Sequence, residues 1–419
     1  MNISEISGQR QFDFVSGFDY IREAGTPGEE KAALAILEEL TKIGVESHLE
    51  KFTFDTFEIK EARLFVTEPY EKEYRVTGYG RCGNTSKDGT EAEFLYVENG
   101  DDISLSYARD KIVMVNNPVR KDMYRKFVEA GAVGFVSITG TPVDEGEDLI
   151  TRTYALPVME ETPIQGVNVH YKDAVEMVSK GASKVKIIVQ QDAVTRTSAN
   201  VVARMEGTDK ADEILTLTAH FDSVPEGPGA YDNMAGCAII MELCHYFKKH
   251  PSRRTMEFVW FGAEEKGLVG SRNYVETHKE ELNKHQFNMN VDLAGQLVGG
   301  TVIGVTGDTS ICHMITYLAN EIGLGMSVRN SIWGSDSNTF AWKGIPAMTL
   351  NRDGFGMHTC HDVAGYLSPW SLQRSGALLG HIAESLGNIA TIPFTKVIPE
   401  NFIKELDDYF RPFGDGRNF

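Results

Sequence analysis

Hydrophobic positions follow a strand–helix alternation in the second half of the chain. After residue 198, short apolar runs are separated by longer segments in which apolar residues recur at helical spacing. The runs predict strands at 214–219, 256–261, 287–291, 301–305 and 347–350, and the spacing predicts helices at 234–249, after 261 and from about 368. Such alternation predicts a mainly parallel sheet with helices on both faces, which is a three-layer α/β/α sandwich.

An amphipathic helix is also predicted near the N-terminus. Thr26 can cap it, Pro27 suits its first position, and Glu29 completes the pattern of a capping box. Apolar residues then recur at helical spacing until Gly44 ends the helix. A strand is expected at 45–54.

The segment 61–191 has a different sequence pattern, which predicts short strands, turns and charged loops. We expect strands at 111–115, 132–138 and 185–189 and helices at 122–130 and 173–180, followed by a polar connector at 195–198. This predicts a smaller, mostly β domain at 61–191, inserted into a discontinuous domain formed by 1–60 and 192–419. The tail from 392 to 419 has little periodicity beyond a helix expected at about 400–409.

The composition narrows the range of partners. Sixty acidic and 41 basic residues give a formal charge of −19, which argues against a nucleic-acid or anionic membrane partner. No apolar run is long enough to span a bilayer, and the start lacks the pattern of a signal peptide. The five cysteines include no CxxC pair, as expected in a reducing compartment, so a cytoplasmic location is expected.

Residues able to bind a metal follow the predicted strands. His220, Glu264 with Glu265, and Asp292 come directly or shortly after three of them, and His358 lies in the loop after a fourth. Asp232 opens the helix that follows the first strand. Because ligands of open α/β sheets gather at the carboxyl ends of the strands, these side chains are expected to meet at one edge.

Two histidines and three carboxylates form a set suited to zinc, with manganese or cobalt as substitutes. The set is His220, Asp232, Glu265, Asp292 and His358. Five ligands exceed the usual three of one catalytic zinc, so we expect two zinc ions and a bridging carboxylate, a site that can hydrolyse amides or esters. Glu264 is free to act as the general base, and Asp222 can orient His220.

Four segments resemble the M28 family of zinc peptidases: TAHFDS at 218–223, GAYDNMAG at 229–236, AEEKGLVGS at 263–271 and HTCHD at 358–362. The resemblance implies that Asp232 bridges the metals, that Glu264 and Glu265 are base and ligand, and that Asp292 completes the set. It favours His358 over His361 as the last ligand. It also implies a cis peptide bond between Asp232 and Asn233.

A further segment, GSDS at 334–337, is similar to a family motif in which histidine commonly stands at the place of Ser337. The inserted domain resembles a protease-associated domain through DKIVMV at 110–115 and FVEAGAVG at 127–134. The resemblances together cover the chain from about residue 18 to 387.

The leading hypothesis is a zinc aminopeptidase acting on peptides with a free N-terminus, with a homo-oligomer left open. Carboxypeptidase specificity is the nearest alternative, and Arg352 is the basic residue that could recognise a C-terminal carboxylate. A glutaminyl-cyclase-like acyltransferase, which uses one zinc on the same fold, is the second alternative.

Overall fold

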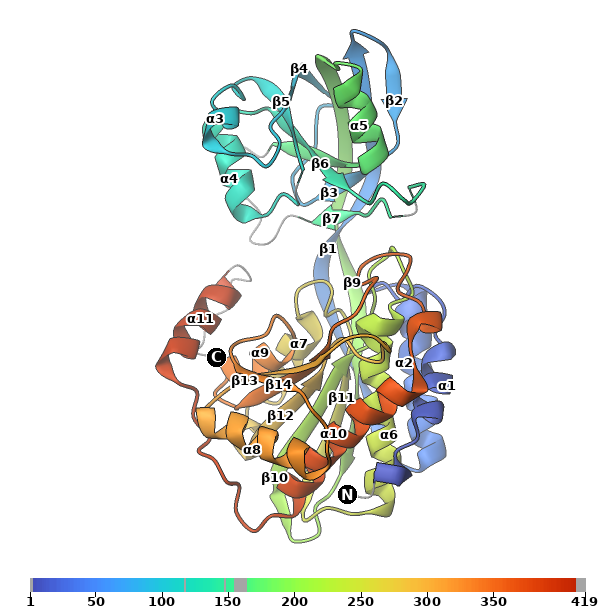
Figure 1. Cartoon of the computed structure of the whole chain (residues 1–419), viewed down its shortest axis with the longest axis vertical. Coiled ribbons are helices and arrows are strands. Elements are labelled where there is room, and N and C mark those ends of the chain that lie inside the picture. Colours follow the sequence, from blue (N-terminus) through green and yellow to red (C-terminus); the bar gives the residue numbers. More distant parts are fainter. Residues whose placement is uncertain (1–2, 117, 147, 154–163, 412–419) are drawn as a thin grey trace. The chain divides into compact units, whose positions relative to one another are not determined.

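The computed structural model describes residues 3–116, 118–146, 148–153 and 164–411. The chain divides into two compact units (Figure 1). One consists of Met1–Phe54 and Arg196–Phe419, and the other of Asp55–Thr195.

The first unit contains a mixed, mainly parallel sheet. Its strand order is β14-β13-β15-β12-β10-β11-β9. Parallel pairing joins β14 to β13, β15 to β12, β12 to β10 and β10 to β11, whereas β13 with β15 and β11 with β9 are antiparallel. The strands are β9 (Lys184–Met205), β10 (Lys210–His220), β11 (Arg254–Phe261), β12 (His285–Val291), β13 (Thr301–Thr306), β14 (Ser327–Asn330) and β15 (Ala347–Arg352).

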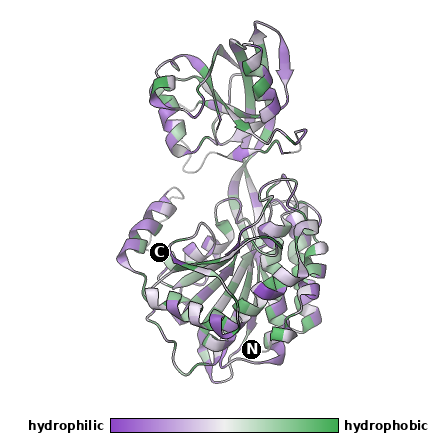
Figure 2. Ribbon diagram, viewed as in Figure 1, coloured by the Kyte–Doolittle hydropathy of each residue, from purple (hydrophilic) through white to green (hydrophobic). Residues whose placement is uncertain are grey.

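Helices cover both faces of this sheet, as the sequence predicts. Side chains of β11 alternate between two cores: Phe258 and Trp260 belong to one, Val259 and Phe261 to the other. The first core includes residues of α1 (Gly8–Ser16), α2 (Pro27–Ile43), α6 (Ala235–Lys249), α8 (Thr309–Glu321) and α10 (Pro369–Asn388). The second includes residues of α7 (Val269–Thr277), α9 (Ser337–Trp342) and α11 (Glu400–Phe410). Figure 2 shows the hydrophobic colours concentrated on the strands between these layers.

The strands of the second unit continue the hydrogen-bonded path through β9, which belongs to both units, and helices lie in the two cores of this unit. Its path is β9-β4-β5-β6-β8-β3-β7. Parallel pairing joins β4 to β5, β5 to β6, β6 to β8 and β3 to β7, whereas β9 with β4 and β8 with β3 are antiparallel. The elements are β1 (Ser47–Glu68), β2 (Lys72–Tyr74), β3 (Val76–Gly80), β4 (Thr90–Tyr96), α3 (Asp102–Leu105), β5 (Lys111–Val115), α4 (Lys121–Ala130), β6 (Gly134–Thr139), β7 (Arg152–Thr153), β8 (Gln165–His170) and α5 (Tyr171–Ser179). Phe127 of α4 lies in one core and Met177 of α5 in the other.

The polar segment 195–198 does join the two units, whose boundary lies between Thr195 and Arg196, but it does so within β9, and its two threonines are β-branched residues that suit a strand. One local expectation is wrong, because the capping box does not form: Thr26 makes no side-chain cap, and Glu29 accepts a hydrogen bond from the Gly25 N–H instead. Within the described residues, no helix has the length and apolar character needed to cross a membrane.

Candidate metal centre and active site

The side chains that the sequence predicts to bind a metal gather where parallel strands end. In the register of β10 and β11, His220 lies opposite Phe261, so the turn that follows β11 begins beside His220. Asp292 follows β12, which pairs with β10 on the other side. The shared direction of these strands brings side chains that are far apart in the sequence to one edge of the sheet.

Six side chains form two groups that could each hold a cation. His220, Glu264 and Asp292 make one group, and Asp232, Glu265 and His358 the other, with the ligand atoms of each group within 4.8 Å of one another. All five ligands expected from the sequence therefore lie in these groups, together with Glu264.

Asp232 faces both groups. Its Oδ1 lies 3.1 Å from His220 Nε2, and its Oδ2 lies 3.0 Å from His358 Nε2. Asp292 Oδ1 is 3.5 Å from His220 Nε2, and Glu265 Oε2 is 3.2 Å from His358 Nε2. The two oxygens of Asp232 thus point to different histidines, which is the arrangement a bridging carboxylate needs.

The backbone around Asp232 is held by two neighbours. The peptide bond between Asp232 and Asn233 is cis, which confirms the expectation from the family resemblance. Asp362 accepts hydrogen bonds from the backbone N–H groups of Tyr231 (2.6 Å) and Asp232 (3.0 Å). Asn233 donates to the Val291 carbonyl at 2.7 Å and so ties this turn to β12. These contacts fix the direction of the Asp232 side chain.

The turn that carries Glu264 and Glu265 is held by Asp222. The Asp222 carboxylate accepts hydrogen bonds from the backbone N–H groups of Glu264 (3.0 Å) and Glu265 (3.1 Å). Its Oδ1 also lies 3.4 Å from Nδ1 of His220. One fully buried carboxylate therefore faces both the first histidine and the two acidic residues of the turn.

Burial and charge perturb the titration of the site. Burial raises the pKa of Glu264 well above its usual value, and the neighbouring carboxylates Asp336, Glu265 and Asp292 add to this. Burial disfavours the charged form of His358, but Glu265 and Asp232 outweigh it and raise the pKa of the imidazole to about 11. Carboxylates at this density favour positive charge between them.

The donor set fits divalent cations such as zinc. Imidazole nitrogens and carboxylate oxygens are the ligands of catalytic zinc sites, and a cation would replace the protons that the carboxylates favour on both histidines. Glu265 Oε1 is buried and accepts no hydrogen bond from the described residues, as expected of an oxygen reserved for a metal.

A pocket of about 330 Å³ opens over these groups. Apart from the six metal-binding side chains, the described residues that line it are Gly267, Leu268, Leu293, Trp333, Gly334, Met357 and Tyr409. None of these described lining residues is lysine or arginine. The pocket therefore combines an acidic floor with apolar and aromatic walls.

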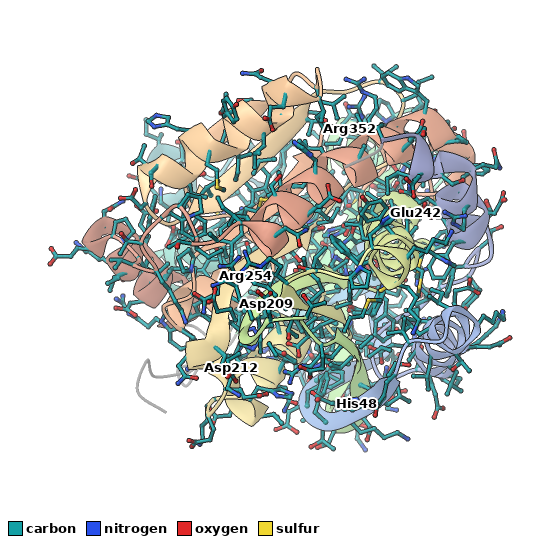
Figure 3. All side chains as sticks on the ribbon, turned by 90° about the horizontal axis from the view of Figure 1, so that it is seen from below. His48, Asp209, Asp212, Glu242, Arg254 and Arg352 are labelled. Carbon is teal, nitrogen blue, oxygen red and sulfur yellow. The ribbon has the colours of Figure 1, made fainter. Side chains whose placement is uncertain are left out.

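Arg352 is engaged elsewhere. Arg352 is buried and is labelled in Figure 3. Its guanidinium donates to the carbonyls of Gln296 (2.6 Å) and Leu297 (3.0 Å) and to the hydroxyl of Thr301 (3.2 Å). These contacts hold a loop and do not present the guanidinium to the pocket lining described above.

The positions of His358, His361 and Ser337 decide which of them lie in the two groups. Among the described residues, His358 and not His361 joins the metal-binding groups. Ser337 is buried and shares a hydrogen bond of 2.6 Å with the Thr349 hydroxyl, so it does not take part in those groups. The sequence pattern assigns no role to two further residues of the site: Asp362 of the HTCHD motif, which holds the backbone at Asp232, and Tyr409 of α11, which lines the pocket.

Comparison with known proteins finds similarity to peptidases. Residues 200–383 match the model of peptidase family M28. Carboxypeptidase Q of Mus musculus is 28% identical over 385 residues, which cover 86% of this chain and 82% of the relative. Aminopeptidase YwaD of Bacillus subtilis is 28% identical over 350 residues, covering 82% and 70%.

The fold is also that of a solved peptidase. A zinc aminopeptidase from Bacillus subtilis superposes with a TM-score of 0.77 at 21% identity, covering 95% of this chain and 99% of that one. The matched segment 200–383 contains all six residues of the two metal-binding groups. Over the segment that carries both metal-binding groups, this chain is therefore similar to the peptidases of family M28.

Proposed function

We propose that this protein is a zinc-dependent aminopeptidase that binds two ions per chain and removes N-terminal residues from peptides. The observation that carries the proposal is the placement of Asp232, whose two oxygens face two separate metal-binding groups with Glu264 beside them. His220 and Asp292 would hold one ion, Glu265 and His358 the other, and Asp232 both.

The bound ions would supply Lewis acidity and an activated water. Glu264 would take a proton from the attacking water and pass it to the leaving amine. Asp222 would hold Glu264 and Glu265 in place through their backbone N–H groups.

The pocket favours a free α-amine over a C-terminal carboxylate. The described lining residues include carboxylates and lack lysine and arginine, and Arg352 is occupied by backbone carbonyls. Carboxypeptidase specificity stays the second candidate, because carboxypeptidase Q is among the relatives. Apolar walls at Leu268, Leu293 and Trp333 favour an apolar N-terminal side chain.

The second unit is proposed to be a protease-associated insert. Its described strands and helices form their own cores, and it interrupts the first unit between residues 54 and 196. It also lies outside the family match at 200–383.

Metal removal tests the proposed activity directly. Dialysis against a chelator is expected to abolish hydrolysis of leucine anilide, and two equivalents of zinc should restore it, because neither metal group can act without its ions. Release of aniline and metal content by plasma mass spectrometry are measured together. An N-acetylated leucine anilide serves as the control and should not be hydrolysed. Hydrolysis of peptides only from the C-terminus would instead establish the carboxypeptidase alternative.

Replacing Asp222 by asparagine should weaken metal binding about 10- to 100-fold, as loss of a carboxylate that orients a ligand commonly does. The amide can accept through one oxygen only, so one of the N–H groups of Glu264 and Glu265 loses its partner. Competition with a chromogenic chelator measures the change. Wild-type metal affinity in this variant would show that Asp222 has no role in the centre.

A further inference from the structure

Three consecutive backbone N–H groups lead into the catalytic turn, and each is bound by a carboxylate. Asp222 accepts from Glu264 and Glu265, as described above. The preceding N–H, that of Ala263, donates to Oε1 of Glu29 at 3.1 Å. Glu29 lies in the first turn of α2, more than 230 positions away in the sequence and outside the family match.

The Ala263 backbone needs such support. Its φ is +54°, a left-handed conformation that costs a residue with a side chain about 1 kcal/mol or more. The next two residues are Glu264 and Glu265, so a change in the backbone at Ala263 would move both the base and a metal ligand. The hydrogen bond from Ala263 to Glu29 opposes that change.

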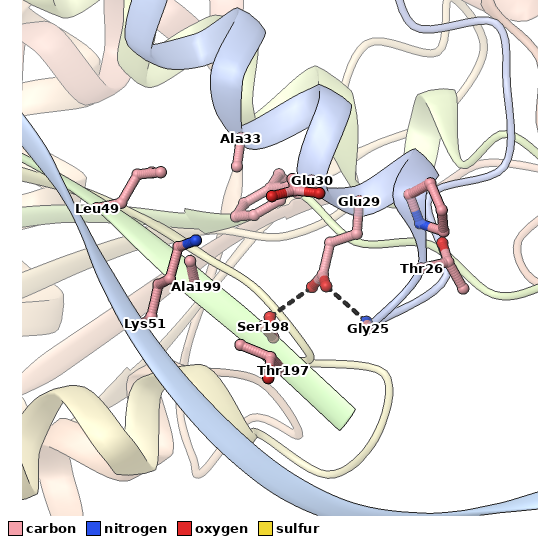
Figure 4. Close-up of a pocket in the computed structure, with 12 residues that line it drawn as sticks. Gly25, Thr26, Glu29, Glu30, Ala33, Leu49, Lys51, Thr197, Ser198 and Ala199 are labelled. Carbon is pink, nitrogen blue, oxygen red and sulfur yellow. Dashed lines mark hydrogen bonds between the residues drawn. The ribbon is translucent and has the colours of Figure 1, made fainter. Parts of the chain in front are cut away.

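Glu29 is itself fixed from three sides, and Figure 4 shows two of these contacts, to Ser198 and Gly25. It is 3% exposed, and besides Ala263 it accepts hydrogen bonds from the Ser198 hydroxyl at 2.7 Å and from the Gly25 N–H at 2.6 Å. The fit is close: a Cβ on Gly262 would lie 2.7 Å from Glu29 Oε1 and 2.4 Å from Ser198 Oγ. Glycine at 262 lets the carboxylate reach the backbone of the turn.

We propose that Glu29 is a positioning residue, whose buried side chain holds the turn that presents Glu264 and Glu265 to the metal centre. This rests on the proposed function of those two residues. The turn is held by an acceptor oxygen at the right distance from the Ala263 N–H, and the negative charge of Glu29 is not required. In agreement, burial and then the charge of Asp222 raise the pKa of Glu29 to about 8.

Two substitutions of Glu29 separate the effect of side-chain length from the effect of its negative charge. Glu29→Gln keeps an oxygen at the distance of Ala263 and Ser198. Its amide NH2 takes the place of the oxygen that accepts from the half-buried Gly25 N–H, so these two donors turn to water. Glu29→Asp keeps the acid but shortens it by one methylene, which withdraws the acceptor from Ala263. Glu29 borders a cavity of about 420 Å³ that can admit water to the shortened side chain.

We expect kcat and zinc affinity to fall in the aspartate variant and not in the glutamine variant. With saturating zinc and leucine anilide, Glu29→Asp should lower kcat about 10- to 100-fold, because small displacements of reacting groups have effects of this size. KM should change less than about threefold, since the pocket walls outside the turn, at Leu293, Trp333 and Met357, are untouched. Its zinc affinity, measured on apoprotein by chelator competition, should fall about 10-fold through Glu265. Glu29→Gln should stay within about threefold of wild type in all three quantities.

Glu242→Asp is the matched control. Glu242 lies on α6, is 2% exposed, and accepts hydrogen bonds from the Ser7 N–H at 2.7 Å and from Arg10 at 2.6 Å (Figure 3). This variant loses a buried carboxylate contact without touching the turn, so its melting temperature should fall while kcat stays unchanged.

The proposal is overturned if Glu29→Asp keeps wild-type kcat and zinc affinity while its melting temperature falls, or if the glutamine variant loses as much as the aspartate variant. An inactive wild-type protein would contradict the proposed function instead. Chelator competition would still test the role of Glu29 in that case.

Discussion

Glu264→Gln is expected to lower kcat by about 10²- to 10⁴-fold, the usual contribution of a general base. The amide keeps the shape of the side chain but cannot take a proton from water. The five metal ligands and the contacts of Asp222 to the backbone of the turn remain. Two zinc ions per chain should therefore be retained, as measured by plasma mass spectrometry beside the anilide assay.

The matched control is Glu280→Gln, at an exposed glutamate outside the two metal-binding groups. It should leave kcat and metal content unchanged. Loss of an ion in Glu264→Gln would show that Glu264 is itself a ligand, since it lies in one group with His220 and Asp292. Full activity would remove Glu264 from the mechanism.

The sequence predicts the candidate metal centre well where a residue able to bind a metal comes directly after a strand with a clear hydrophobic pattern. Apolar runs such as 256–261 and 287–291 are buried strands, and each is followed within a few residues by a metal-binding side chain. Parallel strands that end at one edge bring these side chains together, so pattern and spacing are enough to anticipate the cluster.

Prediction fails where a residue acts through contacts distant in the sequence. Glu29 fits the local capping-box pattern, yet its side chain turns to Ser198 and Ala263, and no local periodicity encodes these partners. Tyr409 reaches the pocket because Phe402, Leu406 and Phe410 anchor α11 in the second core. That docking depends on tertiary packing, which the weak pattern of the tail does not show.

Asp232→Ala is expected to remove both ions, because Asp232 is the one ligand that faces both groups. Loss of a shared ligand should lower the affinity for each ion at least about 100-fold, more than loss of a supporting contact does. Zinc content after gel filtration should fall from two ions per chain towards none, and anilide hydrolysis should stop. Circular dichroism establishes that the variant is folded.

His358→Ala is the comparison that distinguishes a ligand of one ion from a carboxylate shared by both ions. His358 lies 3.0 Å from Asp232 and 3.2 Å from Glu265 and belongs to one group alone, so its loss should release one ion preferentially and leave His220 and Asp292 with theirs. If Asp232→Ala also keeps one ion at wild-type affinity, Asp232 is an ordinary ligand of a single site. Loss of both ions in Asp232→Ala and of one in His358→Ala requires a shared carboxylate, because only a group bound to both ions couples their release.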